Sequence, residues 1–214
     1  MQNDEPSAVG APSTSDTVVA PMRKRPKPGE RRVQILQALA SMLEQPGAER
    51  VTTAALAARL EVSEAALYRH FASKAQMFEG LIDFIEQSVL TLVNQIVERE
   101  DAGRDQATRI VAMVVQFAEK NPGMTRVMVG DALVFENERL QNRMNQFFDK
   151  IEGTLRQVLR DAASGEGSAT PTVDAQVRAS ALTAFVVGRL QRFARSGFRR
   201  APSEHLDASV ALML

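Results

Sequence analysis

The apolar residues of this sequence recur at spacings of three and four positions over most of its length, which is the period of an amphipathic helix. No segment alternates between apolar and polar residues as a half-buried strand would. The pattern predicts two short helices after residues 52 and 63, and further helices over residues 30–44, 73–100, 105–120, 131–162, 173–195 and 203–214. The predicted fold class is therefore all-α.

Two of the predicted helices are short and lie on either side of a tight turn. Thr52 and Ser63 precede them, and their hydroxyl groups are typical N-caps for the free amides of a first helical turn. Helices this short need a packing partner, which the amphipathic segment 30–44 supplies. The three together predict a small head that contains a helix-turn-helix for reading DNA.

The second helix of such a pair enters the major groove with its N-terminal residues nearest the bases, while caps and basic side chains contact phosphates. The residues that we expect to face bases or backbone are Ser63, Glu64, Ala65 and Arg69. Those that we expect to hold phosphates are Tyr68, His70 and Lys74. The alternative is a core aromatic residue for Tyr68 and a solvated charge for Arg69. For Phe71 we expect burial in the head.

The head contains, in order, Thr-Thr at 52–53, Val-Ser at 62–63, Leu-Tyr-Arg-His-Phe at 67–71, Ser-Lys at 73–74 and Met-Phe at 77–78. This order resembles the N-terminal signature of the TetR family of bacterial regulators. The resemblance implies a TetR-like fold, with a three-helix helix-turn-helix head and a C-terminal helical dimerisation body. It also implies DNA contacts by Thr52 and Thr53. The family usually has glycine in the turn where this chain has Glu61, and a left-handed backbone there would cost on the order of 1 kcal/mol.

The helices beyond the head also resemble known regulators. Residues 119–126, 132–152 and 155–160 are similar to stretches of the nucleoid occlusion branch of the family, and the similarity covers roughly residues 30–200. It implies a protein that binds chromosomal sites and antagonises polymerisation of the division protein FtsZ, so that septa do not close over the nucleoid. The alternative is a TetR-type transcriptional repressor with a small-molecule inducer, although Val111, Val114 and Val115 offer no polar groups for such a ligand.

The same resemblance implies that FtsZ binds in a groove along the two helices after the head. The positions associated with this binding are Phe84, Met113, Lys120 and Asn121. Phe84 lies at the margin of its helix's apolar stripe, which suits a partly exposed anchor, and Lys120 is a cation for an acidic and apolar peptide. This chain departs from its relative at Leu92, which replaces arginine, and at Gln116, which replaces glycine.

A TetR-like body implies a homodimer in which the last two long helices of each copy form a four-helix bundle. The apolar stripe suited to this role contains Leu182, Phe185, Val186, Leu190 and Phe193. A monomer core would give the same pattern. Two-fold symmetry would place two recognition helices about one DNA turn apart on a near-palindromic site, which one dimer or two dimers would occupy.

Composition argues against several other functions. The chain has no cysteine and only two histidines, His70 and His205, so we expect neither a thiolate metal site nor a histidine-based catalytic centre. The Gly165-Glu-Gly167 segment lacks the strand and helix of a phosphate-binding glycine motif. We therefore expect no enzyme activity, no metal and no cofactor. No apolar run of about 18 residues occurs, so we expect no membrane insertion and a cytoplasmic, nucleoid-associated protein.

The formal net charge is zero, but the charges are unevenly distributed. A basic cluster just ahead of the head contains Arg23, Lys24, Arg25, Lys27, Arg31 and Arg32. This cluster is either a phosphate-binding arm or a solvated tail. The predicted organisation is a disordered, basic, proline-rich tail over 1–28, a helix-turn-helix domain over 29–74, and a helical domain for dimerisation and partner binding over 75–214.

Overall fold

The computed structural model describes residues 29–45, 51–99 and 103–214. Within these ranges the regular elements are helical and no strand occurs, which confirms the predicted class. The head consists of α1 (Glu30–Leu43), α2 (Thr53–Arg59) and α3 (Glu64–Tyr68). The body consists of α4 (Lys74–Arg99), α5 (Arg104–Lys120), α6 (Pro122–Met128), the 3-10 turn η1 (Asp131–Leu133), α7 (Glu138–Gly165), α8 (Pro171–Arg195) and α9 (Leu206–Ala211).

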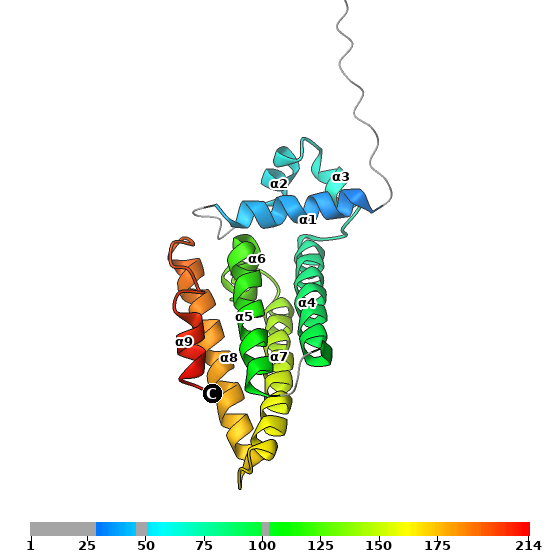
Figure 1. The fold of residues 1–214 in the computed structure, drawn as a ribbon. Helices are drawn as coiled ribbons and strands as arrows, with labels where there is room; N and C mark the ends of the chain where they lie inside the picture. The colour runs from blue at the N-terminus through cyan, green and yellow to red at the C-terminus, as the bar shows by residue number, and fades with distance from the viewer. Residues whose placement is uncertain (1–28, 46–50, 100–102) are drawn as a thin grey trace, which may run out of the picture.

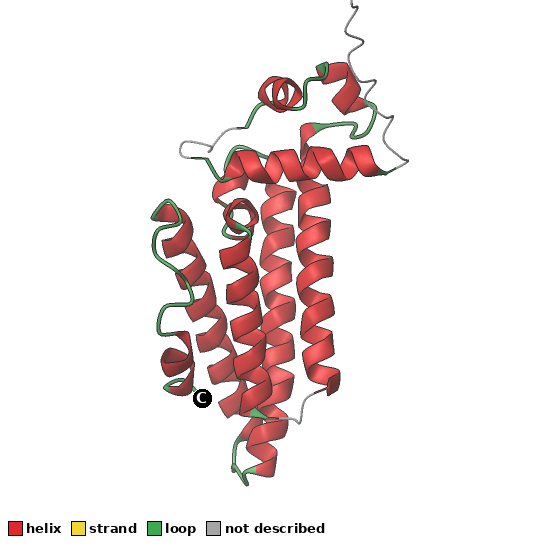
Figure 2. Cartoon of the chain, turned by 45° about the horizontal axis from the view of Figure 1, so that its top comes forward, coloured by secondary structure: helices red, strands yellow, loops and turns green. Residues whose placement is uncertain are grey.

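The head covers one end of an elongated body. Figure 1 shows α1 lying across this end, with α2 and α3 on its outer side. The long helices α4, α5, α7 and α8 run along the body, and the turned view in Figure 2 shows α1 crossing above their ends. The turn between α7 and α8 lies at the opposite end of the molecule, so the helix-turn-helix is presented away from most of the body (Figure 1).

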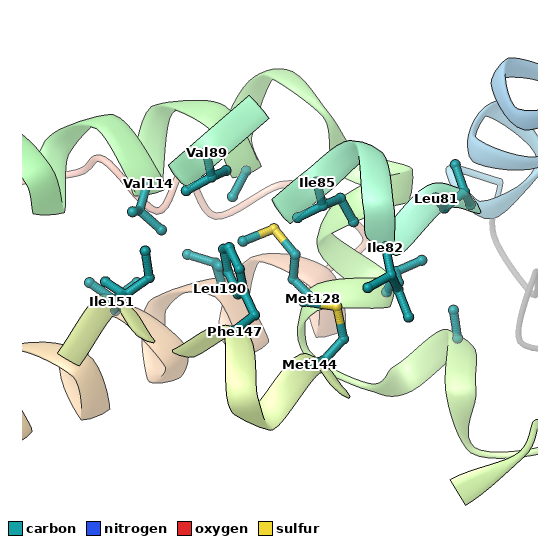
Figure 3. Close-up of a cluster of buried hydrophobic side chains, with 14 of the residues drawn as sticks. Leu81, Ile82, Ile85, Val89, Val114, Met128, Met144, Phe147, Ile151 and Leu190 are labelled. Carbon is teal, nitrogen blue, oxygen red and sulfur yellow. The ribbon is translucent and has the colours of Figure 1, made fainter. Parts of the chain in front are cut away.

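One continuous cluster of buried apolar side chains runs from the head into the body. Phe71, which leads out of α3, is 1% exposed, which confirms its predicted place in the core. Figure 3 shows the central part of the body, where side chains from α4 to α8 point toward one another: Leu81, Ile82, Ile85, Val89, Val114, Met128, Met144, Phe147, Ile151 and Leu190. The head is therefore packed on the body through shared core residues as well as linked to it by the chain.

The head and body meet most closely where α6 packs on α1. A Cβ atom added to Gly123 would lie only 2.0 Å from the backbone oxygen of Ala40. Glycine is required there because any side chain would overlap with backbone, which cannot move aside as a flexible side chain can. At the other side of α6, the buried Thr125 hydroxyl donates to the backbone oxygen of Ala118 at 2.6 Å and so ties α6 to α5.

Ion pairs hold α4 against α7. The guanidinium of Arg143 on α7 lies between Asp83 and Glu86 on α4, with nitrogen to oxygen distances of 2.5 and 2.7 Å. Hydrogen bonding to Glu86 raises the pKa of Arg143 above its already high usual value, with a further contribution from Asp83. Arg139 pairs with Glu79 one turn earlier on α4. These pairs identify the flank of α4 that faces α7.

The sequence prediction of one helix over residues 131–162 is wrong at its start. Instead, η1 ends at Leu133 and α7 begins at Glu138. The side chain of Asn137 caps α7 by accepting a hydrogen bond from the amide of Arg139 at 3.0 Å, and Gly130 before η1 has a left-handed backbone with φ of 83°. The break leaves Val134 and Phe135 exposed at 65% and 67%. Helical apolar spacing in this stretch misled the sequence prediction because it does not reveal a competing cap.

We predict that Gly123→Ala destabilises the protein by about 1–3 kcal/mol, because the added methyl group overpacks the contact between α6 and α1. Gly165→Ala is the matched control, since a Cβ there meets nothing within 4 Å. We expect Gly165→Ala to leave stability unchanged or slightly raised, because alanine favours a helix over glycine. Urea unfolding of both variants measures the difference. Equal stability of the two variants would show that the joint tolerates a side chain.

Candidate nucleic-acid interface

The two helices of the helix-turn-helix begin at capped residues, as the sequence predicted. The Thr52 hydroxyl accepts a hydrogen bond from the amide of Ala55 at 3.2 Å, and the Ser63 hydroxyl accepts one from the amide of Ala66 at 3.3 Å. Both caps lie on the surface of the head, while Leu56 and Leu67 on the opposite faces are buried. The caps therefore serve helix formation and remain near the solvent side where DNA would approach.

The turn between α2 and α3 has the left-handed backbone that glycine usually supplies in this family. Glu61 has a φ of 54°. The Glu61 amide donates to the carbonyl of Ala58 at 3.1 Å, and the Val62 amide donates to the carbonyl of Ala57 at 3.0 Å. This pair of bonds is the Schellman arrangement that ends a helix in a left-handed residue. The turn geometry is thus retained with glutamate, at a backbone cost on the order of 1 kcal/mol.

Polar side chains join the N-terminal ends of α2 and α3. The hydroxyl of Thr53 donates to the Glu64 carboxylate at 2.6 Å, and the hydroxyl of Tyr68 lies 3.4 Å from that of Thr53. Tyr68 is 44% exposed, so it lies on the surface and not in the core. Ala65 lies within α3, Arg69 is the C-cap of this helix, and both are exposed. The structure therefore brings Thr53, Glu64 and Tyr68 together on one surface.

Two basic side chains predicted to lie near phosphates are engaged within the protein. Lys74 forms an ion pair of 2.5 Å with Glu136, which precedes α7, and its side chain is 26% exposed. Arg32 on α1 donates to the backbone oxygen of His70 and lies over the Phe71 ring, with 4.1 Å from guanidinium carbon to ring centroid. The His70 side chain is exposed. Both contacts join segments far apart in sequence, so no local sequence pattern could predict them.

The structure describes Arg31 of the basic cluster ahead of the head, but not its members before residue 29. Arg31 donates to the side chain of Gln34 at 3.0 Å along α1. The remaining members, Arg23, Lys24, Arg25 and Lys27, lie with the rest of the predicted tail outside the described residues. A phosphate-binding role for the arm stays a prediction.

The residues for which the resemblance implies FtsZ binding lie on α4, on α5 and at the junction between α5 and α6. Phe84 is 50% exposed, whereas Met113 is half-buried against the core and Lys120 is exposed. The side-chain amide of Asn121 donates to the carbonyl of Phe117 at 2.7 Å, at the end of α5. Leu92, one of the positions where this chain departs from its relative, is 41% exposed.

The apolar stripe predicted for the dimer interface is mostly covered within one chain. Leu182, Val186, Leu190 and Phe193 are each 4% exposed or less. Phe185 is half-buried, with the guanidinium of Arg189 4.8 Å from its ring centroid. The four buried residues form part of the monomer's own core and leave little surface for a partner. The sequence could not separate these roles because both produce apolar residues at helical spacing.

Among the described residues, no group of three or more His, Asp or Glu side chains is arranged to hold a metal ion. Nor does any described helix combine the length and apolar character needed to cross a bilayer.

Comparison with known proteins matches both parts of the chain to families. Residues 35–81 match the model described as bacterial regulatory proteins of the tetR family, and residues 105–214 match a SlmA-like model described as the tetracyclin repressor-like C-terminal domain. The structure is similar to the TetR family regulator PfmR from Thermus thermophilus, with a TM-score of 0.69, 23% identity, and coverage of 85% of this chain and 97% of that one. This likeness shows the fold.

Curated relatives are much more similar in sequence. The nucleoid occlusion factor SlmA of Photobacterium profundum is 52% identical over 182 residues, which cover 85% of this chain and 92% of the relative. The protein of the same name from Vibrio cholerae is 50% identical over 184 residues, covering 86% and 93%. The chain belongs to the TetR family of DNA-binding bacterial regulators. Within that family it belongs with the SlmA nucleoid occlusion factors.

We predict that Thr52→Ala lowers DNA affinity more than it lowers stability. Loss of the cap should cost about 1 kcal/mol of helix stability and loosen the surface that α2 presents to DNA. Ser168→Ala is the control, because Ser168 lies just before the start of α8, at the end of the body opposite the head. Its hydroxyl also makes local hydrogen bonds: it donates to the Asp174 carboxylate at 2.6 Å and accepts from the Thr170 amide at 3.0 Å. Fluorescence anisotropy with a selected duplex measures affinity. Unchanged affinity in Thr52→Ala would remove this residue from the site.

Proposed function

We propose that this chain is a DNA-bound antagonist of FtsZ polymerisation, which acts as a homodimer on near-palindromic chromosomal sites. The observation that carries the proposal is identity of about 50% to nucleoid occlusion factors over more than nine-tenths of their length. The proposed DNA contacts on the exposed side of the head are Thr52, Thr53, Ser63, Glu64, Ala65, Tyr68, Arg69 and His70. Lys74 is the remaining proposed contact, and it would have to leave Glu136 to reach a phosphate. FtsZ binds elsewhere on the chain, along α4 and α5.

The position of Phe84 supports its role as the anchor for FtsZ. Glu86 faces α7, and Phe84 precedes it by two residues, which corresponds to a rotation of about 200° around the helix. Phe84 therefore lies on the flank of α4 turned away from α7. A half-exposed phenyl ring on a helix flank suits an apolar side chain of a bound peptide, and aromatic residues are common binding hot spots.

The positions of Phe84 and Lys120 along the long axis of the body agree with a surface that they share. The helices α4 and α5 are consecutive and antiparallel, and Gln106 on α5 donates to the carbonyl of Val97 on α4 at 3.0 Å. Phe84 lies thirteen residues before Val97 on α4, and Lys120 lies fourteen residues after Gln106 on α5. At 1.5 Å per residue, each is about 20 Å from this contact, in the direction of the head. Phe84 and Lys120 are thus at similar heights, so one peptide can contact an apolar anchor and a cation. Met113 lies about 10 Å from Lys120 along α5 and is proposed to contact the same peptide.

The homodimer is proposed to form through the outward face of α8. This face is opposite the buried one and carries small or apolar residues at helical spacing, namely Val173, Val177, Ala181, Ala184 and Gly188. Val173 and Val177 are 60% and 63% exposed, and a Cβ added to Gly188 would meet nothing within 4 Å. We name these five residues the α8 outer stripe. It allows close approach of a second helix, and Phe185 borders it.

The alternative function, a repressor with a small-molecule inducer, has weaker support. Val111, Val114 and Val115 are fully packed within the body. A hollow of about 330 Å³ lies between α6, α7 and α8, but it is open to solvent and lined by exposed polar residues including Gln141, Asn145 and Asp149. An inducer pocket usually encloses most of its ligand.

We predict that Phe84→Ala retains DNA affinity but loses antagonism of FtsZ, because truncating a central aromatic anchor costs more than about 2 kcal/mol of binding. Phe135→Ala is the matched control, since Phe135 is also an exposed phenylalanine, at 67%, but lies in the loop before α7. Sedimentation of FtsZ polymers, with each variant bound to a selected DNA fragment, measures antagonism. Thr52→Ala should show the reverse pattern and still bind the FtsZ tail in solution.

Two results would contradict the role of Phe84. If Phe84→Ala lowers the thermal melting temperature strongly, the ring belongs to the core and the FtsZ surface lies elsewhere. If the variant melts normally and still disperses FtsZ polymers as the parent does, this residue is not the anchor.

We predict that Ala184→Glu weakens the dimer at least tenfold, because two-fold symmetry would bring the same carboxylate of both copies to the centre of the interface. Val134→Glu, in the exposed loop before α7, adds the same charge outside the stripe and should leave the dimer intact. Sedimentation equilibrium gives the dissociation constant of each. A dimer that is unaffected by Ala184→Glu would place the interface on another face.

A further inference from the structure

One segment of the body carries basic residues without any acidic ones. Residues 175–203 contain six arginines and no aspartate or glutamate, in a chain whose formal net charge is zero. Four of the six lie within the last turns of α8 and the loop after it: Arg192, Arg195, Arg199 and Arg200. All four are exposed. We name them the α8 arginine cluster.

The α8 arginine cluster lies at the end of the body that carries the head. Figure 1 shows the C-terminal end of α8 and the loop after it beside α6, just below α1. The packing agrees with this view, because α8 contacts α6 and α6 contacts α1. The helix α4, with Phe84, lies on the other side of the body (Figure 1). The cluster is therefore close to the DNA-binding end and separate from the proposed FtsZ surface.

These arginines have no carboxylate partner among the described residues. The described ion pairs of the body involve other cations, and the bond from the Arg199 side chain goes to the backbone oxygen of Ser196, at 2.9 Å. A fifth cation, Arg126 on α6, lies over the Phe198 ring at 5.2 Å, and its Nε atom is buried without a hydrogen-bond partner in the described structure. Positive charge thus accumulates here, and the nearest acidic residue along the chain, Glu204, lies 3.8 Å from His205.

The described part of the head has little positive charge of its own. Residues 29–45 and 51–74 contain five lysine and arginine residues and four glutamates. Two of the five cations, Arg32 and Lys74, are engaged with the protein's own backbone or carboxylate. Duplex DNA carries about one negative charge per 1.7 Å, and proteins gain most of their sequence-independent affinity by neutralising phosphates. A surface that supplies more cations at this end of the molecule would strengthen binding.

We propose that the α8 arginine cluster is a second DNA-contacting surface, which binds phosphates beside the site read by α3 without regard to sequence. The proposal rests on the DNA binding that belongs to this family. Arginine suits the role because its guanidinium binds phosphate oxygens in a bidentate manner and stays charged at any physiological pH. An acidic protein segment is the competing occupant, but DNA held by the head is the polyanion already present at this end.

The test uses the full chain with Arg199→Gln and Arg200→Gln combined, since both residues lie outside the helix and their replacement should not affect helix formation. The matched control combines Arg156→Gln and Arg160→Gln, two exposed arginines of α7 toward the opposite end of the body. Fluorescence anisotropy measures affinity over a series of salt concentrations. It uses two duplexes of equal length, one with a selected site in long flanks and one of unrelated sequence.

We expect the Arg199/Arg200 double variant to bind both duplexes more weakly by the same factor. The slope of log affinity against log salt should become flatter by about 0.9 for each phosphate that the protein no longer neutralises, or roughly 1.8 for two phosphates. Replacing both residues with lysine should restore most of the slope, because the positive charge is kept. The Arg156/Arg160 control should behave as the parent does.

Two results would overturn the proposal. The first is a salt slope equal to that of the parent, and the second is an equal effect of the two double variants, which would indicate only a change in total charge. If the unchanged salt slope is accompanied by a failure to antagonise FtsZ, the cluster belongs to a protein partner instead. A parent chain that bound neither duplex would instead contradict DNA binding itself, which separates that failure from this one.

Discussion

The close contact between α6 and α1 determines how the rest of the molecule is organised. Because Gly123 has no side chain, the backbone of α6 approaches the carbonyl of Ala40, and the head sits directly on the end of the body. The core then continues from α1 through α4 into α7 and α8 without interruption. The orientation of the recognition helix relative to the body follows from this packing, since α3 is itself held by Phe71 against the same core.

The two binding surfaces proposed for this protein are connected by a single helix. The helix α4 follows α3 in the chain after a short connection, and its middle carries Phe84. The pairs between Arg143 and the α4 carboxylates hold the other flank of α4 against α7. A continuous helix with one flank fastened would keep the distance between the proposed DNA-binding and FtsZ-binding residues constant. This arrangement suits a protein that must present a partner surface while bound to the chromosome.

Local sequence signals predicted the head well. Thr52 and Ser63 are N-caps in the structure, and Phe71 is in the core. The left-handed backbone of Glu61 was not predicted, because glutamate replaces the usual glycine there. These features depend on residues within a few positions of each other. Periodicity also located the long helices, because each has one buried face.

Features that depend on distant residues could not be predicted from the sequence. The pairing of Lys74 with Glu136 joins positions 62 residues apart, and neither residue is unusual in its local context. The outer and inner faces of α8 are both apolar, so the sequence could not tell which face belongs to the core and which is free for a partner. The packing of α8 on α5, α6 and α7 separates them.

The arginines at the end of α8 have a consequence for how the protein moves in solution. The formal charge of the whole chain is zero, so an uncompensated positive region at one end requires an equal negative excess elsewhere. Such a molecule has little net attraction to a distant polyanion, so its attraction to DNA depends on the side that it presents. Within about one Debye length of DNA, roughly 8 Å at physiological ionic strength, the arginines at this end would be attracted to the phosphates, which favours approaches with the head end toward the duplex. A local positive region on a chain of zero net charge thus favours DNA encounters in the correct orientation, but it does not make encounters more frequent.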